Sequence, residues 1–220
     1  IVGVNYHPER FIEIREEMSA NKEDKLILTT ESASTLSSRG VYHFPVVKGR
    51  EWEDIIKPDQ QCTSYDTLAV SWGNEAAEAW AYVVENDWFS GEFIWTGFDY
   101  IGEPTPWDGM VHNKPDTLYP NSSYFGVVDT AGFAKDSYYL YRSWWNEEST
   151  TLHLVPGTWN SSNLVVDGSG YVDTAIYTNA PYVELLYNGN VIAKATATTH
   201  TTAAGFSYRT YTETVVDSSL

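Results

Sequence analysis

The feature that most constrains the fold is an alternation of strand and helix patterns in the first hundred residues. Short apolar runs at 1–6, 26–30 and 91–100 predict buried strands. Between them, 8–19 and 74–84 place apolar residues at helical spacing among charged ones. Neighbouring parallel strands need a crossover connection, which a helix usually supplies. The alternation therefore predicts an α/β region built on a parallel sheet.

The second half of the chain carries a different pattern. A helix is predicted at 135–145, and the composition then shifts near 146–151 toward Thr, Val, Tyr and Asn. Short strands follow at 152–155, 163–166, 171–178, 182–187, 191–195 and 206–216. The Asn188-Gly189 pair between two of these strands predicts a type I′ hairpin. We expect two domains, 1–149 and 150–220, the second an immunoglobulin-like β-sandwich that is incomplete because such domains need ~100 residues.

Charge and composition exclude several classes of function. The chain has 30 acidic and 13 basic residues and a formal charge of -17, which argues against nucleic-acid binding. No apolar run approaches the ~20 residues of a membrane span. Cys62 is the single cysteine and the five histidines lack ligand spacing, so we expect neither a disulfide nor a metal or other cofactor. High aromatic content with few bases favours a neutral ligand such as a sugar.

The first residues read as a strand already under way, so we expect the chain to be an excerpt of something longer. Localisation cannot be read from such an N-terminus. The acidic excess is typical of secreted or salt-tolerant enzymes, which favours a secreted or periplasmic protein over a cytoplasmic one.

Three polar or aromatic residues lie in or directly after three neighbouring predicted strands. Glu31 follows the second strand, Trp95 lies in the third, and Tyr6 ends the first. The carboxyl ends of parallel strands form the usual active-site rim. An indole stacks on the apolar face of a pyranose, and a carboxylate can attack the anomeric carbon. A tyrosine hydroxyl donating to that carboxylate would hold it oriented and ionised. The alternative for both aromatic residues is an ordinary core position.

Several ordered motifs make the chain resemble glycoside hydrolase family 2, the β-galactosidase group. They are Thr30-Glu31-Ser32-Ala33-Ser34 followed by Ser38-Arg39-Gly40, the run 91–107, and 122–126 with 135–141. The resemblance covers roughly 1–155. It implies that 1–6, 26–30 and 93–95 are strands six, seven and eight of a (β/α)₈ TIM barrel.

The resemblance also implies roles for individual residues. Glu31 matches the nucleophile of a retaining mechanism, Tyr6 the tyrosine that hydrogen-bonds it, and Trp95 the tryptophan beneath the sugar, whose bond to Thr96 is a candidate non-proline cis peptide. Some members have a histidine where this chain has Ser34, so contacts to sugar hydroxyls there are expected to differ. Further substrate contacts are expected near the mouth of the barrel from Asn5, Asp99 and Glu103.

The second carboxylate of such a mechanism is not found in the chain. Asn74-Glu75 resembles the family's acid/base pair, but it follows the nucleophile and opens a predicted helix, which explains it as an N-cap and a first-turn acid. We therefore expect the 220 residues alone to have little activity and to need the N-terminal part of the enzyme, in the same or another chain, with oligomers possible.

The resemblance predicts hydrolysis of terminal β-galactosides or related oligosaccharides. A β-glucuronidase or β-mannosidase is the alternative within the family, although the low basic content disfavours a uronic acid. A non-catalytic carbohydrate-binding or complementing fragment is the alternative outside it.

Overall fold

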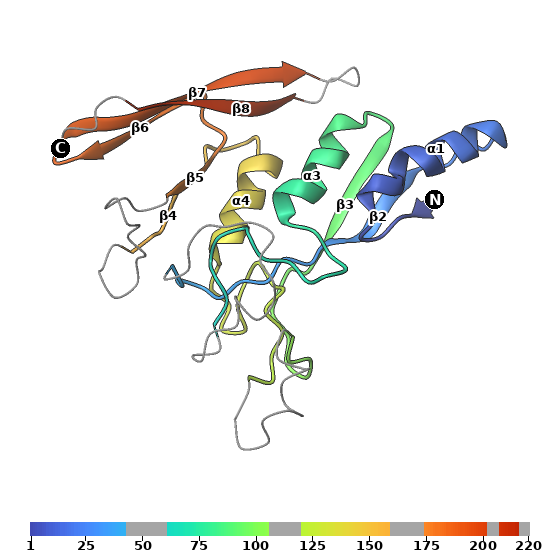
Figure 1. Cartoon of the computed structure of the whole chain (residues 1–220), viewed down its shortest axis with the longest axis horizontal. Coiled ribbons are helices and arrows are strands. Elements are labelled where there is room, and N and C mark those ends of the chain that lie inside the picture. The colour runs from blue at the N-terminus through green and yellow to red at the C-terminus, as the bar shows by residue number, and fades with distance from the viewer. Residues whose placement is uncertain (43–60, 106–119, 159–173, 202–206, 216–220) are drawn as a thin grey trace.

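The computed structural model describes residues 1–42, 61–105, 120–158 and 174–201, together with the backbone of 207–215. Its first part is a parallel sheet in the order β1 (Val2–Gly3), β2 (Ile27–Ala33) and β3 (Phe89–Trp95). The predicted alternation is therefore confirmed (Figure 1). The first strand is shorter than predicted. Within the described residues, the three strands do not close into a barrel.

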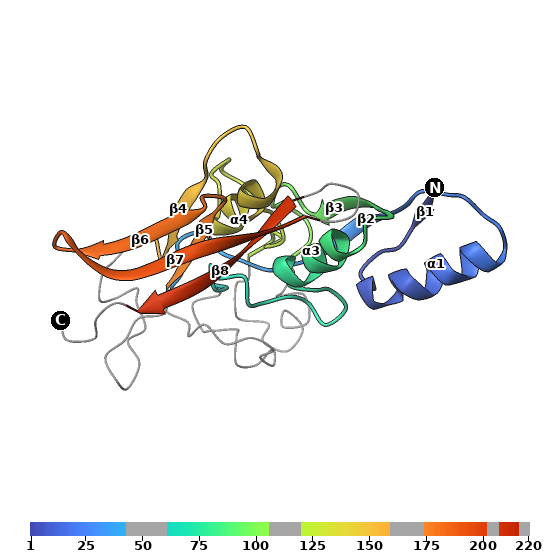
Figure 2. The ribbon, with the colours of Figure 1, turned by 90° about the horizontal axis from the view of Figure 1, so that it is seen from above.

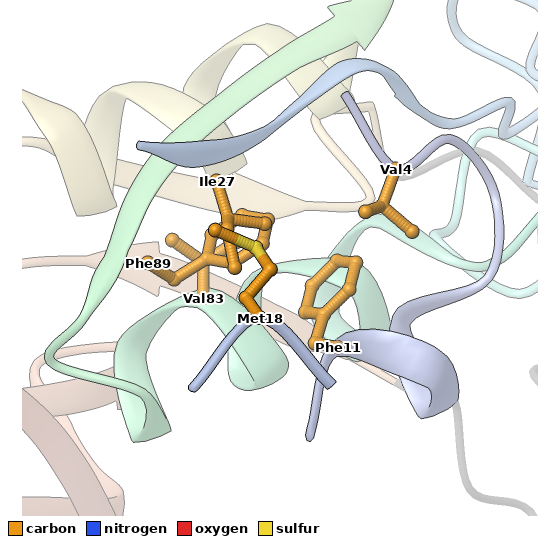
Figure 3. Close-up of a cluster of buried hydrophobic side chains, with 6 residues drawn as sticks. All are labelled: Val4, Phe11, Met18, Ile27, Val83 and Phe89. Carbon is orange, nitrogen blue, oxygen red and sulfur yellow. The ribbon is translucent and has the colours of Figure 1, made fainter. Parts of the chain in front are cut away.

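Both connecting helices cover the same face of this sheet. β1 leads through the 3-10 turn η1 (Pro8–Arg10) into α1 (Phe11–Ala20), and α3 (Ala76–Glu85) joins β2 to β3. Their apolar stripes bury one cluster against the strands, shown in Figure 3, which consists of Val4, Phe11, Met18, Ile27, Val83 and Phe89. Each such side chain stabilises the fold by about 1.5–3 kcal/mol when fully buried.

The start of α3 differs from the prediction that Asn74 caps it. The cap is a carboxylate from the preceding loop, because Asp66 accepts the N–H groups of Ala76 and Ala77 at 3.0 Å each. Glu75 occupies the N-cap position through its backbone, and its side chain makes no capping bond. The sequence could not identify Asp66 because it lies ten residues before the first amide it binds.

The helix α4 (Asp136–Trp145) and the hairpin-like pair β4 (Leu152–Val155) and β5 (Ala175–Thr178) form the middle of the chain. Asp136 joins them, since one oxygen accepts the Tyr42 hydroxyl at 2.9 Å and the other lies 2.6 Å from His153 Nε2. His153 is therefore packed into this junction of the fold. Its ring is about one-fifth exposed and stacks on Tyr139.

The last part is an antiparallel sheet of β6 (Tyr182–Tyr187), β7 (Asn190–Thr201) and β8 (Ser207–Val215). Figure 2 shows it at the opposite end of the molecule from α1. Asn188 and Gly189 both have positive φ, 49° and 81°, which confirms the hairpin predicted there. The strand predicted at 163–166 lies outside the described residues, and the immunoglobulin-like arrangement and the domain boundary stay predictions.

Candidate active site

Glu31 and Tyr6 meet at the carboxyl end of the parallel sheet. The Tyr6 hydroxyl donates to Oε2 of Glu31 at 2.6 Å, the length of a charge-assisted hydrogen bond. Partial burial, and then this bond to the carboxylate, raise the pKa of Tyr6 well above its ordinary value. The phenol is therefore a permanent donor at physiological pH, and it holds one oxygen of Glu31 in place.

A β-bulge aims Glu31 toward this rim. In the β2–β3 register, Thr29 pairs with Glu92 and Ser32 with Ile94, so β2 holds one extra residue in that interval. Such a bulge redirects a side chain that strict alternation would send to the other face. Sequence periodicity does not reveal the bulge, because it depends on how two distant strands align.

Asn5 holds the bulge from one side. Its Oδ1 accepts the N–H groups of Thr30 at 2.9 Å and Glu31 at 3.1 Å, and also the Thr30 hydroxyl at 2.8 Å. Asn5 was predicted to contact substrate. Its oxygen instead binds the backbone that carries Glu31, which indicates a positioning role.

Glu92, which sequence reasoning treated only as part of a motif, lies on the opposite side of the bulge. The Ser32 hydroxyl donates to Oε2 of Glu92 at 2.7 Å. Burial raises the pKa of Glu92 to about 7, although the Ser32 bond opposes the shift. An acid inside the apolar strand Phe89–Trp95 was the available signal, since acids are rarely buried without a partner.

Trp95 ends β3 beside the bulge, where it pairs with Ala33. The peptide bond from Trp95 to Thr96 is cis, as predicted. The indole is half-buried and meets the Tyr100 ring edge-on at 5.9 Å between centroids. Tyr100 in turn donates its hydroxyl to Glu103 at 2.5 Å, and Glu103 is exposed. Trp95, Tyr100 and Glu103 thus form one connected wall, and the substrate contacts of Trp95 and Glu103 stay predictions.

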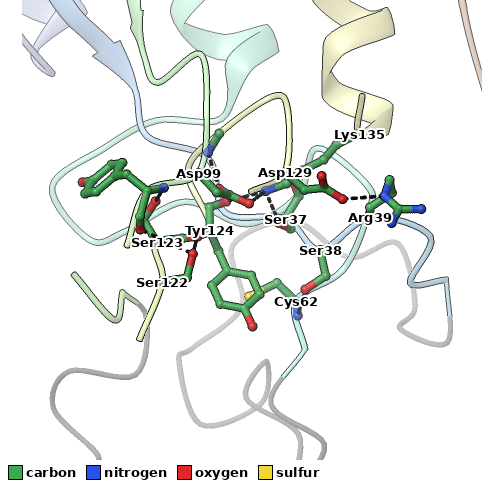
Figure 4. Close-up of polar contacts among 12 residues, drawn as sticks. Ser37, Ser38, Arg39, Cys62, Asp99, Ser122, Ser123, Tyr124, Asp129 and Lys135 are labelled. Carbon is green, nitrogen blue, oxygen red and sulfur yellow. Dashed lines mark hydrogen bonds and ion pairs between the residues drawn. The ribbon is translucent and has the colours of Figure 1, made fainter. Parts of the chain in front are cut away.

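The structure does not favour the predicted substrate contact of Asp99. Its carboxylate is 8% exposed and lies 2.6 Å from Lys135 Nζ, whose side chain is 1% exposed (Figure 4). The other oxygen accepts the N–H of Gly126 at 2.7 Å. Both oxygens are therefore bonded to groups within the protein, which indicates a structural role for Asp99.

Trp72 is an aromatic neighbour of the site that no sequence motif indicated. It meets Tyr6 edge-on at 4.8 Å between ring centroids and is about half exposed. The next residue, Gly73, approaches the β2 backbone closely, since a Cβ there would lie 2.4 Å from the carbonyl oxygen of Ala33. The rim beside Glu31 is therefore aromatic on the Tyr6 side as well as on the Trp95 side.

Two other kinds of feature are absent from the described part of the chain. Among those residues, no group of three or more His, Cys, Asp or Glu side chains could hold a metal ion. Nor do they include a helix long and apolar enough to cross a membrane.

The known proteins that match this chain match it over only part of their own length. No family model matches the chain. A β-galactosidase of Bacteroides ovatus, BoGH2A, is 39% identical over 195 residues, which cover 86% of this chain and 21% of that protein. A putative β-glucuronidase of Formosa agariphila is 31% identical over 172 residues, covering 78% of this chain and 15% of that protein. The chain thus spans about a fifth or less of these relatives.

Solved structures show the same partial correspondence. A β-glycosidase from Bacteroides vulgatus superimposes with a TM-score of 0.60 at 25% identity, over 90% of this chain and 26% of that one. A glycosyl hydrolase family 2 member from Bacteroides cellulosilyticus gives 0.53 at 19% identity, over 99% of this chain and 26% of that one. The chain is thus similar to a part of these glycosidases, which is about a fifth or less of the length of the curated relatives and about a quarter of that of the two solved structures.

Proposed function

We propose that the chain supplies the nucleophile half of a retaining β-glycosidase that acts on terminal β-galactosides. The observation that carries this proposal is the 2.6 Å hydrogen bond from Tyr6 to Glu31, with the Trp72 ring against Tyr6 and Trp95 at the end of the neighbouring strand β3. It leaves one oriented carboxylate next to an aromatic surface, which is the arrangement that covalent glycoside hydrolysis uses.

The reaction takes place in two displacements. Glu31 attacks the anomeric carbon and forms an ester, while the glycosidic C–O bond breaks and a second carboxyl group protonates the leaving oxygen. Water then attacks the same carbon, that second carboxylate takes its proton, and Glu31 leaves as a free carboxylate. In retaining enzymes the two carboxyl groups lie ~5–5.5 Å apart. We propose that the second one belongs to a part of the enzyme outside these 220 residues.

The same proposal assigns β1–β3 to strands six to eight of a TIM barrel. Both helices cover one face of the sheet, as in a barrel, whereas an open doubly wound sheet carries helices on both faces. On the other face Phe93 is 66% exposed, and a closed barrel would bury it. We place the boundary to an immunoglobulin-like sandwich at 149–150, where α4 has ended and the strands of the second half begin.

A β-glucuronide is the second candidate substrate, because relatives named as β-glucuronidases also match the chain. A uronic acid is usually held by a cation. Two cations of the described residues are engaged in ion pairs of their own, Lys135 with Asp99 and Arg39 with Asp129, each at 2.6 Å. This favours the galactoside.

The test assays the complete gene product that carries this chain, and the 220 residues alone, on aryl β-galactoside, β-glucuronide and β-mannoside. We expect turnover of the galactoside by the complete protein only, with loss of turnover in Glu31→Gln. Full turnover by Glu31→Gln would refute the role of Glu31. Turnover by the isolated chain would refute the missing carboxylate, and sugar binding without turnover would favour a non-catalytic module. Preference for the glucuronide would establish the second substrate.

A further inference from the structure

A cluster of buried polar side chains lies behind β2, the strand that carries Glu31, on the side away from the rim. Glu92 lies on β3 next to β2. Its carboxylate accepts the Ser32 hydroxyl of β2, and its backbone pairs in register with Thr29 of the same strand. Tyr141 of α4 is nearby, since the charge of Glu92 contributes to the raised pKa of the Tyr141 hydroxyl after burial, the larger cause. Ile94, which follows Glu92 on the same face, packs against the cluster that contains Tyr141.

The atoms around Glu92 are unusual in their hydrogen bonding. Within the described residues, Oε1 of Glu92, the Thr29 hydroxyl, the Tyr141 hydroxyl and Oδ1 of Asn74 are buried without a partner. Buried polar atoms in folded proteins nearly always have one. Thr29, Ser32 and Asn74 also line a small cavity that Tyr6 borders. This cluster of polar side chains therefore extends from β3, behind the bulge, to Tyr6, which binds Glu31.

We propose that Glu92 is a positioning residue for Glu31, acting through Ser32. Ser32 directly follows Glu31 in the bulged interval of β2, so anchoring its side chain fixes the backbone on that side. Asn5 anchors the other side through the Thr30 and Glu31 amides. Glu31 is thus held between two side-chain anchors, one from the segment that follows β1 and one from β3. This inference rests on the proposed role of Glu31 as nucleophile.

The physical reason for two anchors is the bulge itself. An extra residue interrupts the ladder, and the freed backbone groups no longer fix their own position. A displacement of about 1 Å at a reacting group can cost on the order of 100-fold in rate. Asn5 restrains the two amides but not the side of the strand that faces α4, and Ser32 with Glu92 restrains that side.

The experiment uses the complete gene product and three substitutions. Ser32→Ala removes the donor, Glu92→Leu removes the acceptor at similar volume, and Glu92→Gln keeps an acceptor oxygen. Glu78→Leu, on the exposed face of α3, is the matched control. The measurements are kcat and KM, and the rate at which an activated 2-deoxy-2-fluoro galactoside labels Glu31, located by peptide mass.

We expect Ser32→Ala and Glu92→Leu each to lower kcat and the labelling rate by about 10-fold or more, with KM changed less than twofold. The double variant should lose no more than the worse single one, because both break one interaction. Glu92→Gln should recover most of the rate, and the control should match the parent. A merely structural role would lower the yield of folded protein without changing the rate per labelled site.

Two outcomes separate this inference from the proposed function. Labelling of Glu31 at an unchanged rate in Ser32→Ala and Glu92→Leu would overturn the positioning role and leave the nucleophile in place. A label on another residue, or full activity in Glu31→Gln, would overturn the proposed function itself. Additive losses in the double variant would also contradict a shared interaction between Ser32 and Glu92.

Discussion

Replacing Asp99 by Asn tests whether this carboxylate serves stability or substrate. In the structure it lies 2.6 Å from Lys135 Nζ, and the two side chains are 8% and 1% exposed. Burial raises the pKa of Asp99 and lowers that of Lys135, and their mutual attraction opposes both shifts. The pair is therefore costly to bury and costly to separate.

The expected loss in the free energy of unfolding depends on which partners Lys135 retains when Asp99 is replaced. Its ammonium group also donates to the carbonyl oxygens of Ser37 at 2.7 Å and Tyr124 at 3.3 Å, but neither carries a countercharge. Removing one partner of a buried pair destabilises a protein by about 3–5 kcal/mol. For a unit of about 150–250 residues this lowers the melting midpoint by roughly 6–20 °C. Adding Lys135→Met to Asp99→Asn should recover most of the loss, because no unpaired charge then stays buried.

The assay is thermal unfolding of the complete gene product, with activity per labelled active site measured well below the midpoint. We expect Asp99→Asn to melt earlier while its folded fraction keeps most of its kcat/KM. The reasoning would be refuted by the reverse result, an unchanged midpoint with a loss of activity of about 100-fold or more, equivalent to ~2.7 kcal/mol of transition-state binding. Asp99 would then contact substrate, as the sequence predicted.

Three other predictions follow from single contacts. Tyr6→Phe should lower kcat by about 10- to 100-fold, because a hydrogen bond to a charged group contributes about 1.5–3 kcal/mol; steady-state kinetics check it, and an unchanged kcat would contradict it. Glu92 has a pKa of about 7 in the fold against 4.5 in the unfolded chain. Its contribution to the free energy of unfolding is therefore largest below pH 4.5 and is lost as the pH rises through 7. Glu92→Gln, which cannot ionise, should gain about 3 kcal/mol relative to the parent between pH 4.5 and pH 8, measured as melting midpoints at both pH values; identical pH dependence in the two proteins would disprove the assignment. Asp66→Ala should cost about 1–2 kcal/mol by uncapping α3, measured by thermal unfolding, whereas Asn74→Ala, as a matched change, should not lose that cap.

The positions of the main elements were predictable because they depend on local patterns. Apolar periodicity placed α1, α3, α4 and most strands, and the Asn188-Gly189 hairpin followed from residues that tolerate positive φ. The family resemblance added Glu31, Tyr6 and the cis bond after Trp95, and the contact between the first two is present in the structure.

The remaining site residues were not predictable, because their partners are distant in sequence. Asp99 follows Trp95 by four residues and lies near the same mouth, yet Lys135, 36 positions later, holds it inside. The side-chain oxygen of Asn5 accepts hydrogen bonds from backbone amides 25 and 26 residues away. Glu92 accepts a hydrogen bond from the Ser32 hydroxyl, 60 residues away in sequence. A polar residue near a strand end can face the rim or the core, and composition does not distinguish the two.

The sequence by itself determined a parallel βα unit, a following antiparallel region and a carboxylate between aromatic strand ends. These features depend on short-range periodicity and on the order of motifs along the chain. Only the tertiary structure decided which side chains hold that carboxylate. The deciding element is the bulge in β2, which turns Glu31 to the rim and Ser32 to Glu92. Its register depends on how β2 aligns with β3 about sixty residues away, and no local pattern specifies that alignment.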